Sequence, residues 1–135
     1  MHKCHISNIE NLVNVKGFVR TTPKSTDGGV YALDCEMCYT TEGSELTRIT
    51  VVSYDCKTVY ETLVKPDNPI LDYNTRFSGI SEKDLQNVRT SLRDVQAVLL
   101  NMFSDKTIIV GHSLDGDFRA LRVSYIDEVI KSLLD

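Results

Sequence analysis

The stretch "VYALDCEMCYTT", Val30 to Thr41, begins with a hydrophobic run and then places two acids, Asp34 and Glu36, two residues apart. Alternate residues of a β-strand face the same side, so both carboxylates would leave one face of a strand. Carboxylates that share a face repel each other unless a positive charge lies between them. The stretch predicts a strand with a site for a hard cation, Mg²⁺ or Mn²⁺. The alternative is an exposed acid pair at a fraying strand end.

Length and composition indicate one small globular domain, because the chain has 135 residues and 41% of them are hydrophobic. Its net charge of −4 gives no general attraction to nucleic acid, so such binding needs a local basic patch or metal ions. No apolar run approaches the roughly 18 residues of a membrane span, and no membrane association is expected. The opening residues "MHKCHISNIE" lack the apolar core of a secretory signal.

The four cysteines, Cys4, Cys35, Cys38 and Cys56, are expected to be reduced thiols. Cys35 and Cys38 form a C-x-x-C pair, the spacing of some zinc and redox sites. Residues three apart in a strand point to opposite faces, however, and no second pair follows to complete four ligands. The pair is therefore interpreted as ordinary structural cysteine.

Hydrophobic alternation predicts three strands in the first half of the chain, over Val30–Cys38, Glu45–Tyr54 and Lys57–Pro66. The segment "YDCK" reads as a short hairpin connection between the second and third strands. Residues 1–29 end in the linker-like "TTPKSTDGG" and are expected to be an irregular arm, or to wrap partly on the domain. Residues 30–135 are expected to form the folded domain.

The following residues predict helices packed on that sheet. A proline-containing loop leads to Ser81, which is expected to cap a helix with Asp84 in a capping-box position. An apolar stripe predicts a longer helix over Ser91–Ser104, and "TIIV", Thr107–Val110, reads as a short buried strand. The element order indicates an α/β fold, a mixed sheet with flanking helices.

A second group of acids follows the buried strand in "IIVGHSLDGDFRAL". Gly111 allows a tight turn, and a helix capped by Ser113 would carry Asp115 and Asp117 in its first two turns. Sites in α/β folds gather where strands end and helices begin, so Asp117 is expected to share a metal with the first acid pair. The alternative is that both acids complement the helix N-terminus, which suits Asp115 better than Asp117.

The motifs "ALDCEM", "ELTRITVV", "VKPDNPILDYNTRFSGIS", "SLRDVQAVLLNMF" and "IIVGHSLDGDFRAL" occur in order over about Gly17 to Val123. Together they resemble the Rex-type RNA exonucleases of the DEDDh superfamily. The resemblance implies a ribonuclease H-like fold, 3′→5′ hydrolysis of RNA from its free end, bound Mg²⁺ or Mn²⁺, and a nuclear location.

The resemblance also assigns roles to individual residues. Asp34 and Glu36 match the acids of the first motif and Asp117 the acid of the second, which makes all three implied catalytic residues and metal ligands. Met37 and Cys38 match positions that line the terminal nucleotide, and "FSGI" matches a loop beside the same pocket.

Such nucleases need a third motif, H-x-x-x-x-D, which supplies the general base. His112 and Asp117 have that spacing, but they occupy the turn that the second motif already uses, so the match is rejected. After about Val123 the chain is expected to depart from the family, without the further strand and helices. We therefore expect a partial exonuclease domain, truncated at the C-terminus, with weakened hydrolysis. The alternative is a non-catalytic RNA-binding or regulatory module.

The last residues are expected to extend the helix that begins at about Ser113 towards the C-terminus. Its apolar stripe consists of Leu114, Phe118, Leu121, Tyr125, Val129 and Leu133, joined by Ile126 and Ile130. Without the elements that cover this region in the family, part of the stripe is expected to be exposed. An exposed apolar stripe predicts self-association, a protein partner or poor solubility.

Overall fold

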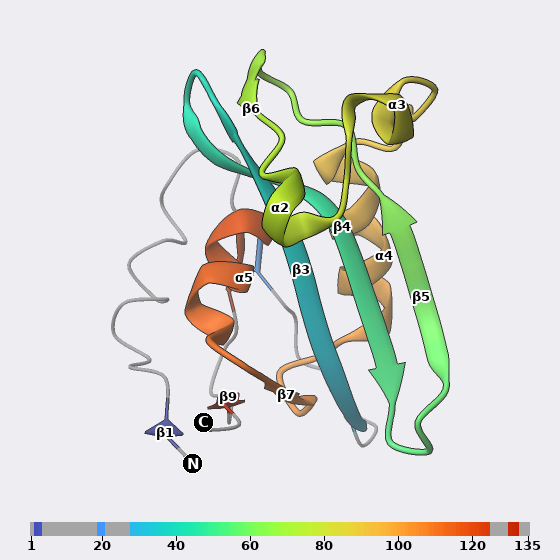
Figure 1. The fold of residues 1–135 in the computed structure, drawn as a ribbon. Coiled ribbons are helices and arrows are strands. Elements are labelled where there is room, and N and C mark those ends of the chain that lie inside the picture. The colour runs from blue at the N-terminus through green and yellow to red at the C-terminus, as the bar shows by residue number, and fades with distance from the viewer. Residues whose placement is uncertain (1, 4–18, 21–27, 125–129, 133–135) are drawn as a thin grey trace.

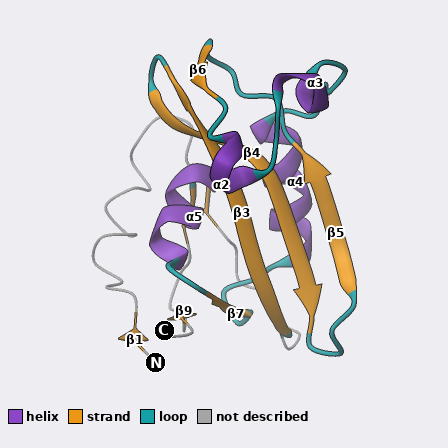
Figure 2. Cartoon of the chain, in the orientation of Figure 1, coloured by secondary structure: helices purple, strands orange, loops and turns teal. Residues whose placement is uncertain are grey.

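The computed structural model describes residues 2–3, 19–20, 28–124 and 130–132. They form a mixed α/β structure of strands and short helices (Figures 1 and 2). The strands are β1 (His2–Lys3), β2 (Val19–Arg20), β3 (Val30–Thr40), β4 (Gly43–Ser53), β5 (Thr58–Leu63), β6 (Ile70–Asp72), β7 (Ile108–Gly111), β8 (Val123–Ser124) and β9 (Ile130–Ser132). The helices are α2 (Thr75–Ser78), α3 (Glu82–Leu85), α4 (Leu92–Met102) and α5 (Leu114–Leu121).

The larger sheet has the strand order β1-β9-β7-β3-β4-β5, with β6 paired to the far end of β3. Strands β3, β4 and β5 are antiparallel, whereas β7 runs parallel to β3. The three predicted N-terminal strands and their hairpin connection are confirmed, each with ends shifted by a few residues. β7 pairs only with Val30 to Ala32 of β3. Between these residues and the pairing of β6 with Tyr39 and Thr40, α5 lies beside that edge of β3 (Figure 1).

The core lies between the sheet and helices α4 and α5, which contribute to one apolar cluster. Leu33 and Cys35 of β3 point into this core, so Asp34 between them points to the opposite face. Phe103, which follows α4, is 1% exposed, and its ring lies 5.2 Å from that of Tyr31. Burying each such side chain contributes roughly 1.5–3 kcal/mol to stability. This core fixes which face of β3 carries the acids.

Two helices begin at capping boxes, and the sequence predicts the one at Ser81. In α4 the Ser91 hydroxyl accepts from the Asp94 amide at 3.2 Å, and Asp94 Oδ2 accepts from the Ser91 amide at 2.9 Å. Ser81 and Asp84 form the same reciprocal arrangement at α3. The loop predicted before Ser81 contains two elements that the sequence did not predict, β6 and α2. Both are too short to show a hydrophobic period.

The prediction of one long C-terminal helix is wrong. α5 ends at Leu121, where Arg122 adopts a left-handed conformation with φ 52°. The buried amide of Gln96 on α4 donates to the Leu121 carbonyl at 3.0 Å. This bond satisfies a carbonyl that a continuing helix would have used, and Val123 then starts β8 with its side chain 1% exposed.

The chain also returns to the sheet after α5, contrary to the expected departure from the family pattern. β9 pairs in parallel with β7, and Ile130 lies opposite Ile109. Leu114, Phe118 and Leu121 of the predicted stripe lie on α5 and are at most 1% exposed, so this part of the stripe is not an exposed association surface. The stripe positions Tyr125, Ile126, Val129 and Leu133 lie outside the described residues.

Two short strands fall within residues 1–29, the predicted arm. β1 pairs with β9 and β2 pairs with β8, so these two pairs of residues add to strands from the other end of the chain. Among the described residues, no helix is long and apolar enough to cross a membrane.

Candidate active site

The acid pair lies on the face of β3 that turns away from the core. Asp34 is exposed and Glu36 is half-buried, while their neighbours Leu33 and Cys35 are 3% and 7% exposed. In the register with β4, Thr50 lies opposite Asp34 and Arg48 lies opposite Glu36. The two carboxylates therefore project side by side from one strand, as the D-x-E spacing predicts.

A β-bulge in β4 lies directly opposite Glu36. Glu36 pairs with Arg48 but the next residue, Met37, pairs with Leu46, so Thr47 is the extra residue. The Thr47 side chain is fully buried, and its hydroxyl donates to the Glu36 carbonyl at 3.1 Å. Its own carbonyl accepts from the Val64 amide at 2.8 Å. The bulge thus fixes the backbone from which the Glu36 carboxylate projects.

Among the described residues, Arg48 is the basic side chain that forms an ion pair with one of the two acids. Its Nη2 lies 3.7 Å from Glu36 Oε1. Burial raises the pKa of Glu36, the charge of Asp34 raises it further, and Arg48 lowers it. Arg48 therefore offsets part of the repulsion between the two acids. Neither Arg48 nor Thr47 was predicted as a site residue, although the three-residue step between buried Leu46 and Ile49 indicates the bulge.

Asp117 on α5 is a buried acid, 6% exposed. Burial is the largest cause that raises its pKa to about 7, followed by the charges of Asp34 and Glu36. Asp117 Oδ2 is buried and has no hydrogen-bond partner in the described part of the chain. A buried oxygen in the field of two further carboxylates is suited to a cation or a proton. Asp115, by contrast, is exposed in the first turn of α5.

Gly111 lets the turn before α5 approach β3. A Cβ atom at this position would lie 2.8 Å from the Leu33 carbonyl oxygen and 2.5 Å from Leu114 Cδ2. The missing side chain therefore allows β7 and the start of α5 to pack directly against the strand of the acid pair. This close packing places Asp117 near Asp34.

Metal coordination requires side chains to lie closer together than does the electrostatic coupling that raises a pKa. In the part of the chain that the structure describes, no group of three or more His, Cys, Asp or Glu side chains is arranged to hold a metal ion. Two charges interact over distances several ångströms longer than a metal–oxygen bond, which is about 2.0–2.6 Å. The donor set and the orphaned oxygen of Asp117 fit a hard cation. Asp34, Glu36 and Asp117 as ligands of one metal remain a prediction.

Met37 and Cys38, which the resemblance implies to line the terminal nucleotide, are largely buried in the protein. Met37 is half-buried and packs against the core, and Cys38 is 0% exposed. Burial raises the pKa of the Cys38 thiol to about 11, and burial also raises the pKa of Cys35 well above its ordinary value. Both are free thiols that resist the ionisation that zinc binding needs. Contact of Met37 and Cys38 with a nucleotide remains a prediction. Because the Cys38 side chain is buried, such a contact would involve its backbone.

The "FSGI" segment, Phe77 to Ile80, contains the end of α2 and its C-cap Gly79, and α2 lies against β3 (Figure 1). The side-chain Nδ2 of Asn74, directly before α2, donates to the Met37 carbonyl at 3.5 Å. Phe77 on α2 is 74% exposed. A hollow of about 460 Å³ beside the loop is lined by Arg48 and Leu63 from the sheet and by Gly79 and Ile80 after α2.

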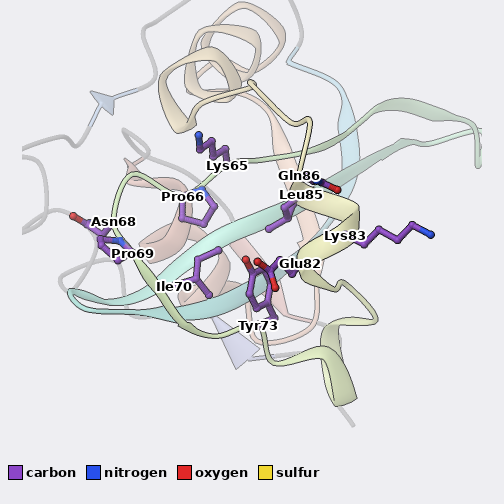
Figure 3. A pocket seen from close by; sticks show the side chains of 10 residues that line it. All are labelled: Lys65, Pro66, Asn68, Pro69, Ile70, Tyr73, Glu82, Lys83, Leu85 and Gln86. Atoms are coloured by element: carbon purple, nitrogen blue, oxygen red, sulfur yellow. The ribbon is translucent and has the colours of Figure 1, made fainter.

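A second, larger pocket of about 560 Å³ lies between the β6 segment and α3 (Figure 3). Its lining includes Lys65, Tyr73, Glu82 and Leu85, and none of the predicted site residues. Figure 3 shows Tyr73 and Glu82 side by side, and burial with the charge of Glu82 raises the pKa of Tyr73. The acids of β3 and α5, rather than this pocket, carry the chemistry that the sequence indicates.

The chain is similar in sequence to a known protein family and to several known proteins. A family model described as exonuclease, of the RNase T type, matches residues 31–129. The human RNA exonuclease 1 homolog is 57% identical over 124 residues, which are 89% of this chain and 10% of that protein. RNA exonuclease 1 of Saccharomyces cerevisiae is 47% identical over 103 residues, 74% of this chain and 19% of that protein. The chain thus spans a tenth to a fifth of the length of these relatives.

Solved structures with the same fold include exonuclease modules. The Neurospora crassa Pan2 catalytic unit, which contains a protease and a nuclease domain, superposes with a TM-score of 0.64 at 21% identity, over 83% of this chain and 19% of that chain. The Saccharomyces cerevisiae Pan2 pseudoubiquitin hydrolase–RNA exonuclease module, in complex with AACCAA RNA, gives 0.63 at 17% identity, over 90% and 25%. At these identities the likeness concerns the fold, and it confirms the expected ribonuclease H-like architecture.

Proposed function

Because the chain belongs to the exonuclease family whose model matches residues 31–129, we propose that it is part of a 3′→5′ exoribonuclease that acts in the nucleus. The observation that carries the proposal is the buried Asp117 carboxylate, which has an unsatisfied oxygen and lies in the field of Asp34 and Glu36. RNA as the substrate is supported by relatives named RNA exonuclease and by a structural neighbour bound to RNA.

Exonucleases of this family generally use divalent metal ions. We assign Asp34, Glu36 and Asp117 as the residues that hold Mg²⁺ or Mn²⁺. In a two-metal site the ions activate water and stabilise the leaving oxygen. The chain supplies the carboxylates, the bulge at Thr47 orients Glu36, and Arg48 limits the repulsion between the acids.

Hydrolysis by these 135 residues alone is proposed to be slow. Of the three histidines, only His112 has an aspartate five residues later, and that aspartate is Asp117, which the metal site needs. The absence of a positioned general base costs roughly 10²- to 10⁴-fold in rate. A non-catalytic RNA-binding module is the second candidate. It is favoured by the lack of a preformed three-residue metal group among the described side chains.

The test is degradation of a 5′-labelled single-stranded RNA by the 135-residue chain, with Mn²⁺ or with a chelator. We expect slow, metal-dependent shortening from the 3′ end that Asp34→Ala and Asp117→Asn abolish, while Asp115→Asn, an exposed acid on the same helix, leaves the rate unchanged. Shortening that survives Asp34→Ala would refute the site. RNA binding without any shortening would favour the second candidate.

A further inference from the structure

The pocket of about 560 Å³ between the β6 segment and α3 has two walls that hydrogen bonds hold in place. The wall formed by residues 65–69 is tied to β4 by Glu45, whose carboxylate accepts from the Asp67 amide at 3.0 Å and from Asn68 Nδ2 at 2.9 Å. The other wall is α3, which begins at the capping box of Ser81. Ligand sites are usually preformed clefts of roughly 300–1,000 Å³, and this pocket has both properties.

The pocket presents opposite charges at its two ends and an apolar surface between them (Figure 3). Lys65 lies at one end, whereas Tyr73 and Glu82 lie side by side at the other. Ile70 and Leu85 line the space between these ends. Among the ion pairs of the described residues, none involves Lys65 or Glu82, so both charges are available to a ligand. The pocket therefore suits an elongated molecule with an anionic group at one end and a hydrogen-bond donor at the other.

The loop wall of the pocket is a poor partner for a peptide backbone. Pro66 and Pro69 have no N–H group. The amides of Lys65 and Asp67 already donate within the protein, the first of them to the Thr90 carbonyl at 2.8 Å. Peptides that add to a strand are held by main-chain hydrogen bonds, and this wall has few to offer. Recognition by side chains favours a small, flat molecule with polar ends over a peptide.

We propose that this pocket binds a free nucleoside 5′-monophosphate whose base carries an amino group, AMP or CMP. The phosphate contacts Lys65, the base lies against Ile70 and Leu85, and Glu82 accepts a hydrogen bond from the amino group. Adenine and cytosine have such a donor, whereas a pyrimidine with a carbonyl oxygen at that position offers an acceptor. Uracil, with an oxygen there, would face the Glu82 carboxylate with like polarity.

The inference goes beyond the proposed function and does not depend on it, because none of the three acids assigned to the metal site lines this pocket. Hydrolysis that leaves the 3′ oxygen on the strand releases nucleoside 5′-monophosphates. The proposed function would thus produce the ligand, and the pocket would hold that product away from the place of hydrolysis.

Titration of AMP and of adenosine into the 135-residue chain, followed by amide chemical-shift changes in NMR, tests the proposal. A chelator and an Asp34→Ala background keep metal-bound nucleotide out of the acid site. We expect AMP to shift the amides around Lys65, Tyr73 and Glu82 and to leave those around Asp117 unchanged. Lys65→Met should raise Kd for AMP about 5- to 10-fold, the effect of roughly one lost hydrogen bond, and should leave Kd for adenosine unchanged.

Two further variants test the other end of the pocket and the specificity of the effect. Glu82→Met should abolish the preference for AMP and CMP over UMP. Lys106→Met removes an exposed lysine outside the pocket and should bind AMP as the wild type does. Lys65 and Glu82 are exposed as well, so all three variants should unfold at the temperature of the wild type.

Absence of AMP binding at millimolar concentration, or equal binding by Lys65→Met and Lys106→Met, would overturn the proposal. Tighter binding of an unphosphorylated oligoribonucleotide than of AMP would also overturn it, since the pocket would then belong to a strand-binding surface. Each of these results leaves open the Asp34-dependent shortening of RNA, so failure of this inference and failure of the proposed function are distinguishable.

Discussion

At the scale of single residues, Asp117 shows how the fold prepares a site. Burial and two neighbouring acids raise its pKa to about 7 from the ordinary 3.8. Between these pH values the folded state therefore binds more protons than the unfolded state. The contribution of Asp117 to the free energy of unfolding must fall as pH rises through that window. The folded state then carries a buried charge that two neighbouring acids repel.

Asp117→Asn should for this reason stabilise the metal-free protein at pH 8. A pKa shift of this size corresponds to an increase in the free energy of unfolding on the order of 1–4 kcal/mol, with almost no gain at pH 4. Urea unfolding in a chelator at the two pH values measures the difference. Equal free energies of unfolding of the two proteins at pH 8 would mean that the charged Asp117 carboxylate does not destabilise the folded state. Asp115→Asn, at an exposed position, is the matched control.

How far the sequence predicts the site can be judged from the same residues. The D-x-E spacing predicts the shared face of Asp34 and Glu36, because strand alternation alone determines it. The contact of Arg48 with Glu36 depends on the register between two strands, and that register is shifted by a bulge. The three-residue step from Leu46 to Ile49 indicates a bulge, but the pattern of one strand does not give the residue that lies opposite it, so Arg48 and Thr47 were missed.

At the scale of elements, the bulge in β4 is a device for orienting Glu36. Thr47→Val keeps the shape of the buried side chain but removes the hydroxyl that donates to the Glu36 carbonyl. We expect a loss of about 1–3 kcal/mol in the free energy of unfolding from the unpaired group, together with weaker Mn²⁺ binding.

Thr47→Ser separates orientation from general packing. It restores the hydroxyl while leaving the methyl group out, and it should recover Mn²⁺ affinity better than stability. Titration of Mn²⁺ and thermal unfolding of both variants measure the two effects. A Thr47→Val protein with wild-type Mn²⁺ affinity would show that the bulge has no part in the site.

Elements were predictable where local signals decide them. Strand alternation predicted β3 to β5, the capping box at Ser81 predicted the start of α3, and an apolar stripe predicted α4. The period of apolar residues continued past Leu121, but the helix did not, because Gln96 of another helix binds the Leu121 carbonyl. A contact between helices that are distant in sequence cannot be read from the period of one of them.

At the scale of the whole molecule, an acidic chain that binds RNA needs cations. The net charge is −4, and the proposed site consists of three carboxylates, which would repel a phosphate. Metal binding should therefore stabilise the fold as well as enable RNA binding. At a concentration of about 100 times Kd, a ligand that binds only the folded state adds about 2.7 kcal/mol to the free energy of unfolding.

Titration of Mn²⁺ into the chain, followed by electron paramagnetic resonance of the free ion, is the most direct test of the central claim. The account predicts saturable binding that is lost in Asp34→Ala and Asp117→Asn and kept in Asp115→Asn. It also predicts that affinity rises with pH through about 7, since Asp117 must release its proton. Absence of saturable binding at pH 8, or binding that all three variants share with the wild type, would contradict the claim that these acids form a metal site.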